Sequence, residues 1–199
     1  MCIVKKRDTK ELYAMKYMNK GRIIKKNAVD NVLQEAEMMN KMNHPFIVNL
    51  WFSFQDEEDL FLVVDLLLGG DLSWHLEQEN RMEVDRVLLY VAEVALALEY
   101  LKRKKIIHRD VKPANMLLDS NGHVHLTDFN VACYKEQSPV TACTGTRPYM
   151  APEMFNPGRY GYSYSVDWWS LGVAAYEMMK GVVSGVNYIV LSEIICLGI

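Results

Sequence analysis

The residues best suited to catalysis lie close together between positions 106 and 130, in the stretch IIHRDVKPANMLLDSNGHVHLTDFN. Asp110 is followed closely by Lys112 and Asn115, and Asp128 lies near the end of the stretch. The amide oxygen of Asn115 and the carboxylate of Asp128 are hard oxygen ligands that suit Mg²⁺, which keeps further positions for water and phosphates. Asp110 could then accept a hydroxyl proton, and Lys112 could neutralise a phosphoryl group during its transfer.

The turn sequence Asp-Ser-Asn-Gly at positions 119–122, with an apolar run on either side, predicts a β-hairpin. If these four residues close the turn, Asn115 lies opposite Leu126 and Asp128 falls just beyond the same open end. The two oxygen ligands would therefore converge where Asp110 also arrives. An ordinary hairpin with incidental polar ends is the alternative, and it leaves the order of these residues unexplained. The predicted strands are Met116–Leu118 and residues 124–127.

These residues resemble the catalytic loop and metal-binding loop of protein kinases, H-R-D-x-K-P-x-N followed by D-F-G. The third residue of the second motif is Asn130, which accepts positive φ more readily than a bulky residue and could preserve a backbone that needs it there. Together with YAMKYMNK and DLLLGGDL, the DFN sequence is similar to the YANK kinases of the AGC serine/threonine group. The resemblance implies a two-lobed α+β fold, ATP and Mg²⁺ as cofactors, and proteins with Ser or Thr hydroxyls as substrates.

The start of the chain predicts a β-hairpin, with strands over residues 3–5 and 12–18 on either side of a polar turn. In its second strand, Tyr-Ala-Met-Lys at 13–16 resembles the V-A-I-K strand of kinases. The resemblance places Ala14 and Lys16 in the nucleotide site, with Lys16 holding the α- and β-phosphates of ATP. A lysine in a solvated edge strand is the plainer reading of the same residue.

A helix is predicted over residues 28–42, where apolar side chains recur at helical spacing. At about 100° per residue, Glu35 projects into the apolar arc, whereas Glu37 falls outside it. Because an unpaired buried charge is costly, Glu35 needs a cationic partner, and we expect that partner to be Lys16. By the resemblance, Glu35 matches the αC glutamate whose ion pair with the strand lysine marks the active arrangement.

Residues 1–65 are expected to form a partial N-lobe, an antiparallel sheet with one helix, and residues 66–70 the hinge that follows it. By the resemblance, Asp65 and Leu67 offer backbone hydrogen bonds to adenine, and Asp71 approaches the ribose. A glycine-containing linker without a ligand fits the same residues. The further strands predicted for the sheet are residues 47–55 and 60–65.

Residues 71–181 are expected to form a partial C-lobe. Asp71 is the predicted N-cap of a short helix over 71–78, and long helices are predicted over 83–103 and 164–180. In the last of these, Asp167 resembles the aspartate that braces the catalytic loop through backbone hydrogen bonds. His123 and His125 alternate on one strand, a spacing open to metal chelation, but a structural role is favoured because no third ligand is near. The side chains predicted to share the buried face of the helix over 83–103 are Leu88, Val91, Ala95, Leu98 and Leu101.

Residues 131–153 resemble an activation segment that ends in an A-P-E motif. The combination of Lys112 with Thr146 favours Ser/Thr over Tyr specificity. The AGC pattern puts a phosphorylated threonine three residues before Gly145, where this chain has Ala142, with Thr141 and Thr144 as neighbours. A preference for basic substrates would rest on two acidic side chains. These are Asp71 and Glu177.

The resemblance covers residues 1–181. A glycine-rich loop would precede this region in the kinase pattern and further C-lobe helices would follow it, so we expect a fold that is incomplete at both ends. The apolar residues 182–199 match no part of the pattern, and Glu193 and glycines make them unsuited to a membrane span. The leading interpretation is a serine/threonine protein kinase. The alternative is a catalytically impaired kinase fragment that acts as a binding or regulatory module.

Composition narrows the compartment and the partners. The chain has 199 residues, 50% of them hydrophobic, so it can bury a substantial core. Its net charge of −3 carries no electrostatic signature of nucleic-acid binding. The 4 cysteines are scattered, which indicates a reducing compartment and no disulfide framework. No secretory signal or membrane anchor is evident, so we expect a cytoplasmic protein.

Overall fold

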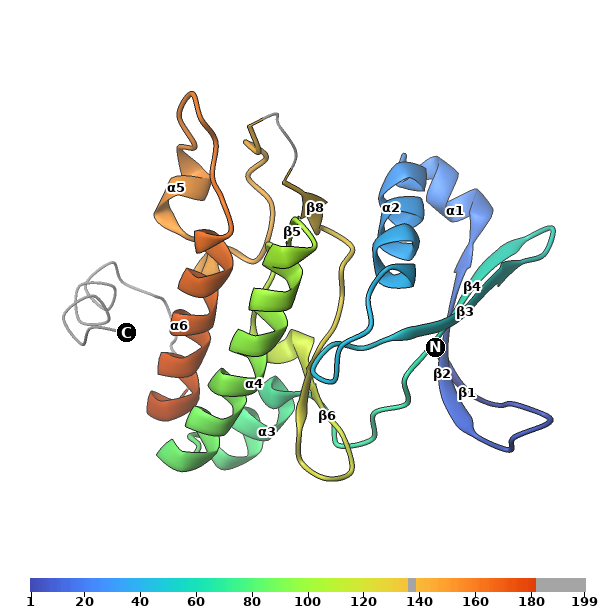
Figure 1. The fold of residues 1–199 in the computed structure, drawn as a ribbon, viewed down its shortest axis with the longest axis horizontal. Helices are drawn as coiled ribbons and strands as arrows, with labels where there is room; N and C mark the ends of the chain where they lie inside the picture. Colours follow the sequence, from blue (N-terminus) through green and yellow to red (C-terminus); the bar gives the residue numbers. More distant parts are fainter. Residues whose placement is uncertain (136–138, 182–199) are drawn as a thin grey trace.

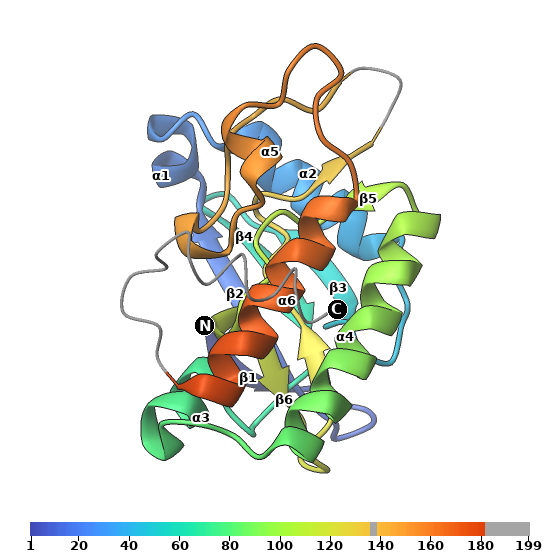
Figure 2. The same ribbon diagram turned by 90° about the vertical axis from the view of Figure 1, so that its left-hand side faces the viewer.

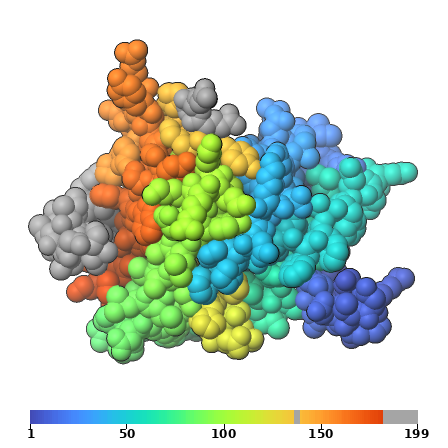
Figure 3. All heavy atoms as spheres, in the orientation of Figure 1, coloured from blue at the N-terminus to red at the C-terminus, as the bar shows by residue number. Residues whose placement is uncertain are grey.

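The computed structural model describes residues 1–135 and 139–181, so the apolar stretch 182–199 lies outside the described residues. The described chain forms a smaller lobe built on a sheet and a larger lobe built mainly of helices (Figure 1). In the space-filling view, atoms around α2 (Val29–Asn40) lie between the helical lobe and the sheet (Figure 3). None of the described helices is long and apolar enough to cross a bilayer.

A four-stranded antiparallel sheet forms the smaller lobe, in the strand order β1-β2-β4-β3. The antiparallel sheet predicted from the sequence is confirmed. One boundary is wrong, because β3 begins at Leu50 and not at position 47. Residues 46–48 pair instead with the other lobe, where Val48 N–H donates to the carbonyl of Leu126 and Leu126 N–H to that of Phe46. The strands are β1 (Cys2–Lys5), β2 (Leu12–Asn19), β3 (Leu50–Gln55) and β4 (Asp59–Val64).

Two helices accompany the sheet. The predicted helix is α2 (Val29–Asn40), and a short helix that was not predicted, α1 (Lys20–Lys25), precedes it. Asn19 begins α1, because its side-chain oxygen accepts the N–H of Arg22 at 3.2 Å.

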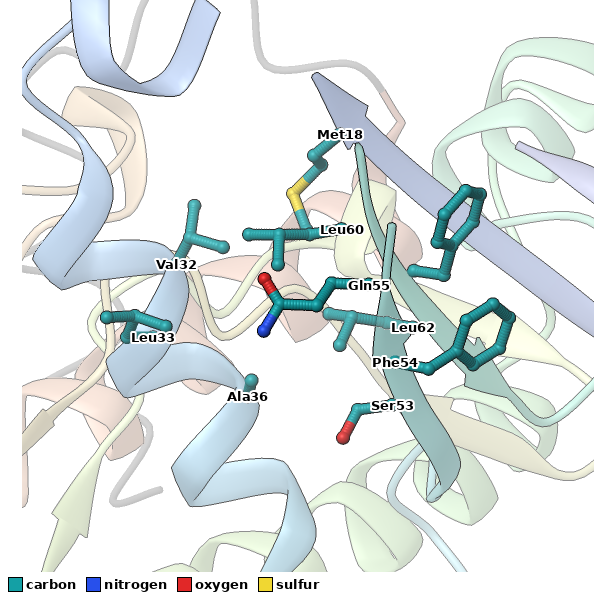
Figure 4. A pocket seen from close by; sticks show the side chains of 10 residues that line it. Met18, Val32, Leu33, Ala36, Ser53, Phe54, Gln55, Leu60 and Leu62 are labelled. Carbon is teal, nitrogen blue, oxygen red and sulfur yellow. The ribbon is translucent and has the colours of Figure 1, made fainter. Parts of the chain in front are cut away.

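The helix α2 packs unevenly against the sheet. Met38 and Met39 near its end are buried, whereas Leu33 in its first half is 55% exposed. Between that first half and strands β3 and β4 lies an apolar groove of about 180 Å³ (Figure 4). The position of α2 therefore depends chiefly on its last two turns. The groove is lined by Met18, Val32, Leu33, Ala36, Ser53, Phe54, Gln55, Leu60, Phe61 and Leu62.

In the larger lobe, α4 (Val84–Arg103) and α6 (Ser165–Lys180) lie side by side (Figures 1 and 2). The shorter α3 (Leu72–Glu79) begins at Asp71, whose carboxylate accepts the N–H of Trp74 at 2.9 Å, so the predicted N-cap is confirmed. The remaining elements are β5 (Ile106–Ile107), η1 (Pro113–Asn115), β6 (Met116–Leu118), β7 (Val124–Leu126), β8 (Cys133–Tyr134), η2 (Arg147–Tyr149) and α5 (Pro152–Phe155).

The buried face of α4 differs from the predicted one at its first turns. Leu88 is 58% exposed, whereas its neighbour Val87 is buried. Val91 and Ala95 are half-buried, and only the end of the predicted set, Leu98 and Leu101, is fully buried. The helix is apolar on more than one side, so spacing alone does not select the inward stripe. The buried side chains of α4 are Val87, Tyr90, Glu93, Val94, Ala97, Leu98 and Leu101.

The hairpin of β6 and β7 forms as predicted, but its register is shifted by one residue. Met116 pairs with Leu126, so Asn115 lies opposite Thr127, whose N–H donates to the Asn115 carbonyl at 3.0 Å. The turn is one residue longer than expected because the Asp119 carboxylate accepts the N–H groups of both Asn121 and His123. The two oxygen ligands still reach the same end of the hairpin.

A buried carboxylate on α4 holds this hairpin against the helix. Glu93 is 4% exposed; its oxygens lie 2.6 Å from Nδ1 of His123 and 2.8 Å from the N–H of Val124. The hydrogen bond to Glu93 raises the pKa of His123. The structural role favoured for His123 is confirmed, and within residues 1–135 and 139–181 no three acidic, histidine or cysteine side chains are grouped to hold a metal.

Replacing Glu93 by Ala should destabilise the fold, because the buried N–H of Val124 would lose its acceptor. The expected loss is about 1–3 kcal/mol in the free energy of unfolding, measured by urea denaturation. The matched control is Glu99→Ala on the same helix, where the carboxylate lies at the surface beside Arg103 and its loss should cost well under about 1 kcal/mol. Equal effects at the two positions would contradict the assigned role of Glu93.

Candidate active site

The carboxylate of Asp110 is the centre of the site, and donors from two segments of the chain converge on it. From the catalytic loop, Lys112 Nζ lies 2.7 Å from Oδ2 and Asn115 Nδ2 lies 3.1 Å from the same atom. From the activation segment, the N–H and hydroxyl of Thr146 donate to Oδ1 at 2.9 and 2.6 Å. Lys112 also donates to the Thr146 hydroxyl at 2.7 Å.

Burial acts to raise the pKa of Asp110, but the hydrogen bonds from Lys112 and Thr146 and the charge of Lys112 lower it below its ordinary value. Asp110 is therefore ionised throughout the neutral pH range. A base in this state can accept a proton without first losing one.

The loop that carries Asp110 is held by a buried carboxylate from α6. The two oxygens of Asp167 accept the N–H groups of His108 and Arg109, both at 2.8 Å, so the predicted bracing is confirmed. Burial raises the pKa of Asp167, although the nearby His108 and these two hydrogen bonds act in the opposite direction. The bracing matters because Arg109 has a φ of 68°, a conformation that residues with a side chain rarely adopt.

His108 supports the site as a neutral group. It is wholly buried, and burial lowers its pKa. Its Nδ1 faces the N–H of Asp110 at 3.2 Å and must accept, so Nε2 carries the proton and donates to the Thr127 carbonyl at 3.0 Å. The ring of Phe129 contacts His108 edge-on, with centroids 4.9 Å apart. His108 thereby ties the catalytic loop to the loop that contains Asp128.

The loop around Asp128 differs from the predicted backbone. The positive φ, 68°, is at Asp128 and not at Asn130, because the chain turns there to bury Phe129, which is 1% exposed. Asn130 is exposed and its amide lies 3.4 Å from Oδ2 of Asp128. The expectation that Asn130 is tolerated for its positive φ is therefore wrong, and an exposed asparagine at this position meets no backbone constraint.

The side chains of Asn115 and Asp128 fit the requirements of Mg²⁺. Asn115 is 6% exposed, and its Nδ2 donates to the carbonyl of Asp110 at 2.8 Å, which leaves its amide oxygen for another partner. Asp128 follows at the open end of the hairpin. An amide oxygen with one carboxylate matches the donor set of an ion that binds through few protein ligands and keeps its waters and phosphates.

The predicted ion pair between the sheet and α2 is confirmed. Lys16 Nζ lies 2.9 Å from Oε1 of Glu35, and the Glu35 side chain is 5% exposed against 34% for Lys16. Glu37 lies at the surface as expected, where it pairs with Lys41. Ala14, one strand repeat before Lys16, is buried opposite Val64 of β4.

The segment between β4 and α3 uses its acidic side chains internally. The Asp65 carboxylate accepts from Nε1 of Trp51 at 2.6 Å and from the N–H of Asn49 at 2.8 Å. Its own N–H donates to the Asn49 carbonyl at 3.2 Å. Asp71 caps α3, and Glu177 accepts from the Tyr149 hydroxyl at 2.6 Å. Both acids named for binding basic substrates therefore already have partners within the chain, and of these only the cap of α3 by Asp71 was predicted from the sequence.

The protein kinase domain model matches residues 2–186, so this chain belongs to the protein kinase family. Serine/threonine-protein kinase 32C of Mus musculus and that of Homo sapiens are each 58% identical to it over 91% of this chain and 38% of the relative. Serine/threonine-protein kinase 32B of Homo sapiens is 58% identical over 91% of this chain and 45% of the relative. The predicted resemblance to this type, the YANK kinases, is confirmed, and the chain spans less than half the length of these relatives.

Replacing Lys16 by Met should destabilise the protein by about 1–3 kcal/mol, because the buried Glu35 carboxylate would lose its hydrogen-bonded cationic partner. Changing both residues, Lys16→Met with Glu35→Leu, should recover most of the loss in urea denaturation. The matched control is Lys41→Met, which removes the exposed partner of Glu37 on the same helix and should cost less than about 0.5 kcal/mol. A double variant less stable than the single one would contradict this account.

Proposed function

We propose that this chain is the catalytic part of a serine/threonine protein kinase, which transfers the γ-phosphoryl group of ATP to a hydroxyl of a protein substrate. The observation that carries the proposal is the Asp110 carboxylate, kept ionised beside Lys112 and Thr146. Asp110 orients the attacking hydroxyl and accepts its proton as the bond to phosphorus forms. Lys112, next to it, offsets negative charge on the group in transit.

The residues proposed to hold ATP come from both lobes. Lys16, positioned by Glu35, binds the α- and β-phosphates, and Asn115 and Asp128 hold Mg²⁺. Protein kinases generally use both cofactors, and the ion supplies charge neutralisation to the phosphates when bound. We assign adenine and ribose contacts to Ala14, to the backbones of Asp65 and Leu67, and to Asp71. The Asp65 N–H already donates to Asn49, so its carbonyl is the group available to adenine.

The Lys112–Thr146 pair and the net charge of the chain bear on the class of substrate. Lys112 and Thr146 share a hydrogen bond beside Asp110, and this pair supports serine and threonine over tyrosine. The net charge of −3 supports protein substrates without nucleic acid, and we infer a cytoplasmic enzyme. We assign residues 1–65 to the N-lobe, 66–70 to the hinge and 71–181 to the C-lobe, with 182–199 as a divergent tail.

Replacing Asp110 by Asn should lower Mg-ATP-dependent transfer to a serine- or threonine-containing protein by on the order of 10²–10⁴-fold, because the amide cannot accept the proton. Transfer of ³²P from labelled ATP measures the effect. The matched control is Asp85→Asn, at an exposed position in the first turn of α4, which should retain the parental rate. If the parent and the Asp110 variant give the same background, the catalytic proposal fails. A thermal shift with Mg-ATP but without transfer would instead favour the binding module.

The pH dependence of the reaction should reveal the effect of Lys112 on Asp110. The pKa of Asp110 lies below its usual range, so kcat should not fall from protonation of this base between about pH 8 and pH 5. In Lys112→Met the pKa of Asp110 should rise because its strongest cationic donor is gone, and the acid limb of kcat should move to higher pH. An unchanged acid limb would contradict the assignment of Asp110 as the base.

A further inference from the structure

A chain of hydrogen bonds through Tyr162 links the catalytic loop to the activation segment. Arg109 donates through a guanidinium nitrogen to the Tyr162 hydroxyl at 3.3 Å. That hydroxyl in turn donates to the carbonyl of Ala142 at 2.6 Å. Tyr162 is 3% exposed, so water does not compete for these bonds, and a buried hydroxyl with both roles filled prefers a single position.

The backbone of Tyr162 also binds the activation segment. The N–H of Tyr162 donates to the Val140 carbonyl at 3.0 Å, and the two residues form an antiparallel bridge. Gly161 permits this approach, because a Cβ built on it would lie 2.4 Å from the Val140 carbonyl oxygen at a φ of +65°. Tyr162 therefore fixes residues 140 and 142 from one place.

The same segment, residues 140–146, also contains Thr146, which donates to Asp110. Three residues beyond Ala142, Gly145 lies against the catalytic loop, where a Cβ would come within 2.3 Å of the Arg109 carbonyl oxygen. Thr146 then donates twice to Asp110. Displacing Ala142 would therefore draw Thr146 away from Asp110 without touching the Lys16–Glu35 pair, which lies in the other lobe.

The Arg109 side chain has a backbone carbonyl as its other partner besides Tyr162. Its Nε donates to the Val131 carbonyl at 2.6 Å, and within the part of the chain that the structure describes it forms no ion pair with a carboxylate. On the activation segment, the residue that accepts the Tyr162 hydrogen bond is Ala142, whose methyl group cannot be phosphorylated. The Ala142 contact with Arg109 is thus made through a tyrosine hydroxyl and a backbone carbonyl, both uncharged.

We propose that Tyr162 is a positioning residue for phosphoryl transfer, whose hydroxyl couples Arg109 to Ala142 and sets the activation segment without covalent modification at that position. The inference rests on the proposed kinase function. Tyr162 acts through Thr146 on Asp110, so its loss affects the transfer step and the protein substrate more than the binding of ATP.

The test compares Tyr162→Phe with the parent and with Tyr164→Phe in the full chain. The phenylalanine keeps the packing of Tyr162 against Ile107 and Val166 and removes only the hydroxyl. We expect kcat to fall about tenfold, corresponding to loss of one hydrogen bond to a charged group, with the KM for ATP unchanged. Tyr164→Phe, two residues away on the same segment, should match the parent.

Two further measurements separate this inference from the proposed function. Hydrogen exchange of the amides in residues 139–146 should accelerate in Tyr162→Phe and not in Tyr164→Phe, whether or not the chain transfers phosphate. Phosphatase treatment should leave the parental rate unchanged. Parental kcat together with parental exchange in Tyr162→Phe would overturn the role of Tyr162, and a rate lost on phosphatase treatment would overturn independence from modification. An inactive parent whose segment still loosens in Tyr162→Phe would count against the kinase proposal alone.

Discussion

The geometry of the site depends on one buried carboxylate, that of Asp167. Its two oxygens bind the N–H groups of His108 and Arg109, the residues immediately before Asp110. Arg109 has a positive φ, a conformation that costs on the order of 1–3 kcal/mol and persists only where the surroundings enforce it. Two hydrogen bonds to an acidic side chain, shielded from water, provide that enforcement. The direction in which Asp110 leaves the loop is therefore decided by a residue of α6, and the catalytic loop cannot adopt it on its own.

The pKa values of Asp167 and Asp110 are shifted in opposite directions by their surroundings. Asp167 is wholly buried and its pKa is raised, whereas the pKa of Asp110 is lowered because Lys112 and Thr146 surround it. The first accepts backbone hydrogen bonds from the catalytic loop, and the second accepts hydrogen bonds from the side chains of Lys112 and Thr146. Since Thr146 belongs to the activation segment, part of the lowering of the Asp110 pKa comes from that segment. The same segment is held by Tyr162, so the base, its donor and their anchor form one connected set.

The sequence predicted best those contacts that each follow from one strong physical demand. A carboxylate that points into the core needs a cationic partner, and this requirement predicted the ion pair between Glu35 and Lys16. The Asp-Ser-Asn-Gly cluster predicted the hairpin turn. Prediction from the sequence failed where one residue pattern is compatible with more than one structure. The apolar surface of α4 allowed two stripes, so Leu88 was wrongly buried, and side-chain acceptance by Asp119 lengthened the turn by a residue. Glu93 and Tyr162 were missed because their partners are distant in sequence, and a glutamate flanked by apolar residues in α4 was the only signal for the first of them.

The pairing of residues 46–48 with β7 has a mechanical consequence. The lobes are joined covalently between β4 and α3, and a second time by the hydrogen bonds between Leu126 and its partners Phe46 and Val48. The N–H of Asn43 adds a further hydrogen bond to the Tyr100 hydroxyl of α4 at 2.9 Å, so a rigid rotation of one lobe against the other that preserves these attachments is restricted. Asp128 follows Leu126 by two residues and lies close to these attachments, whereas β1 is an edge strand of the sheet in the smaller lobe (Figure 1). A relative motion of the lobes would therefore displace Asp128 less than the edge of the sheet at β1.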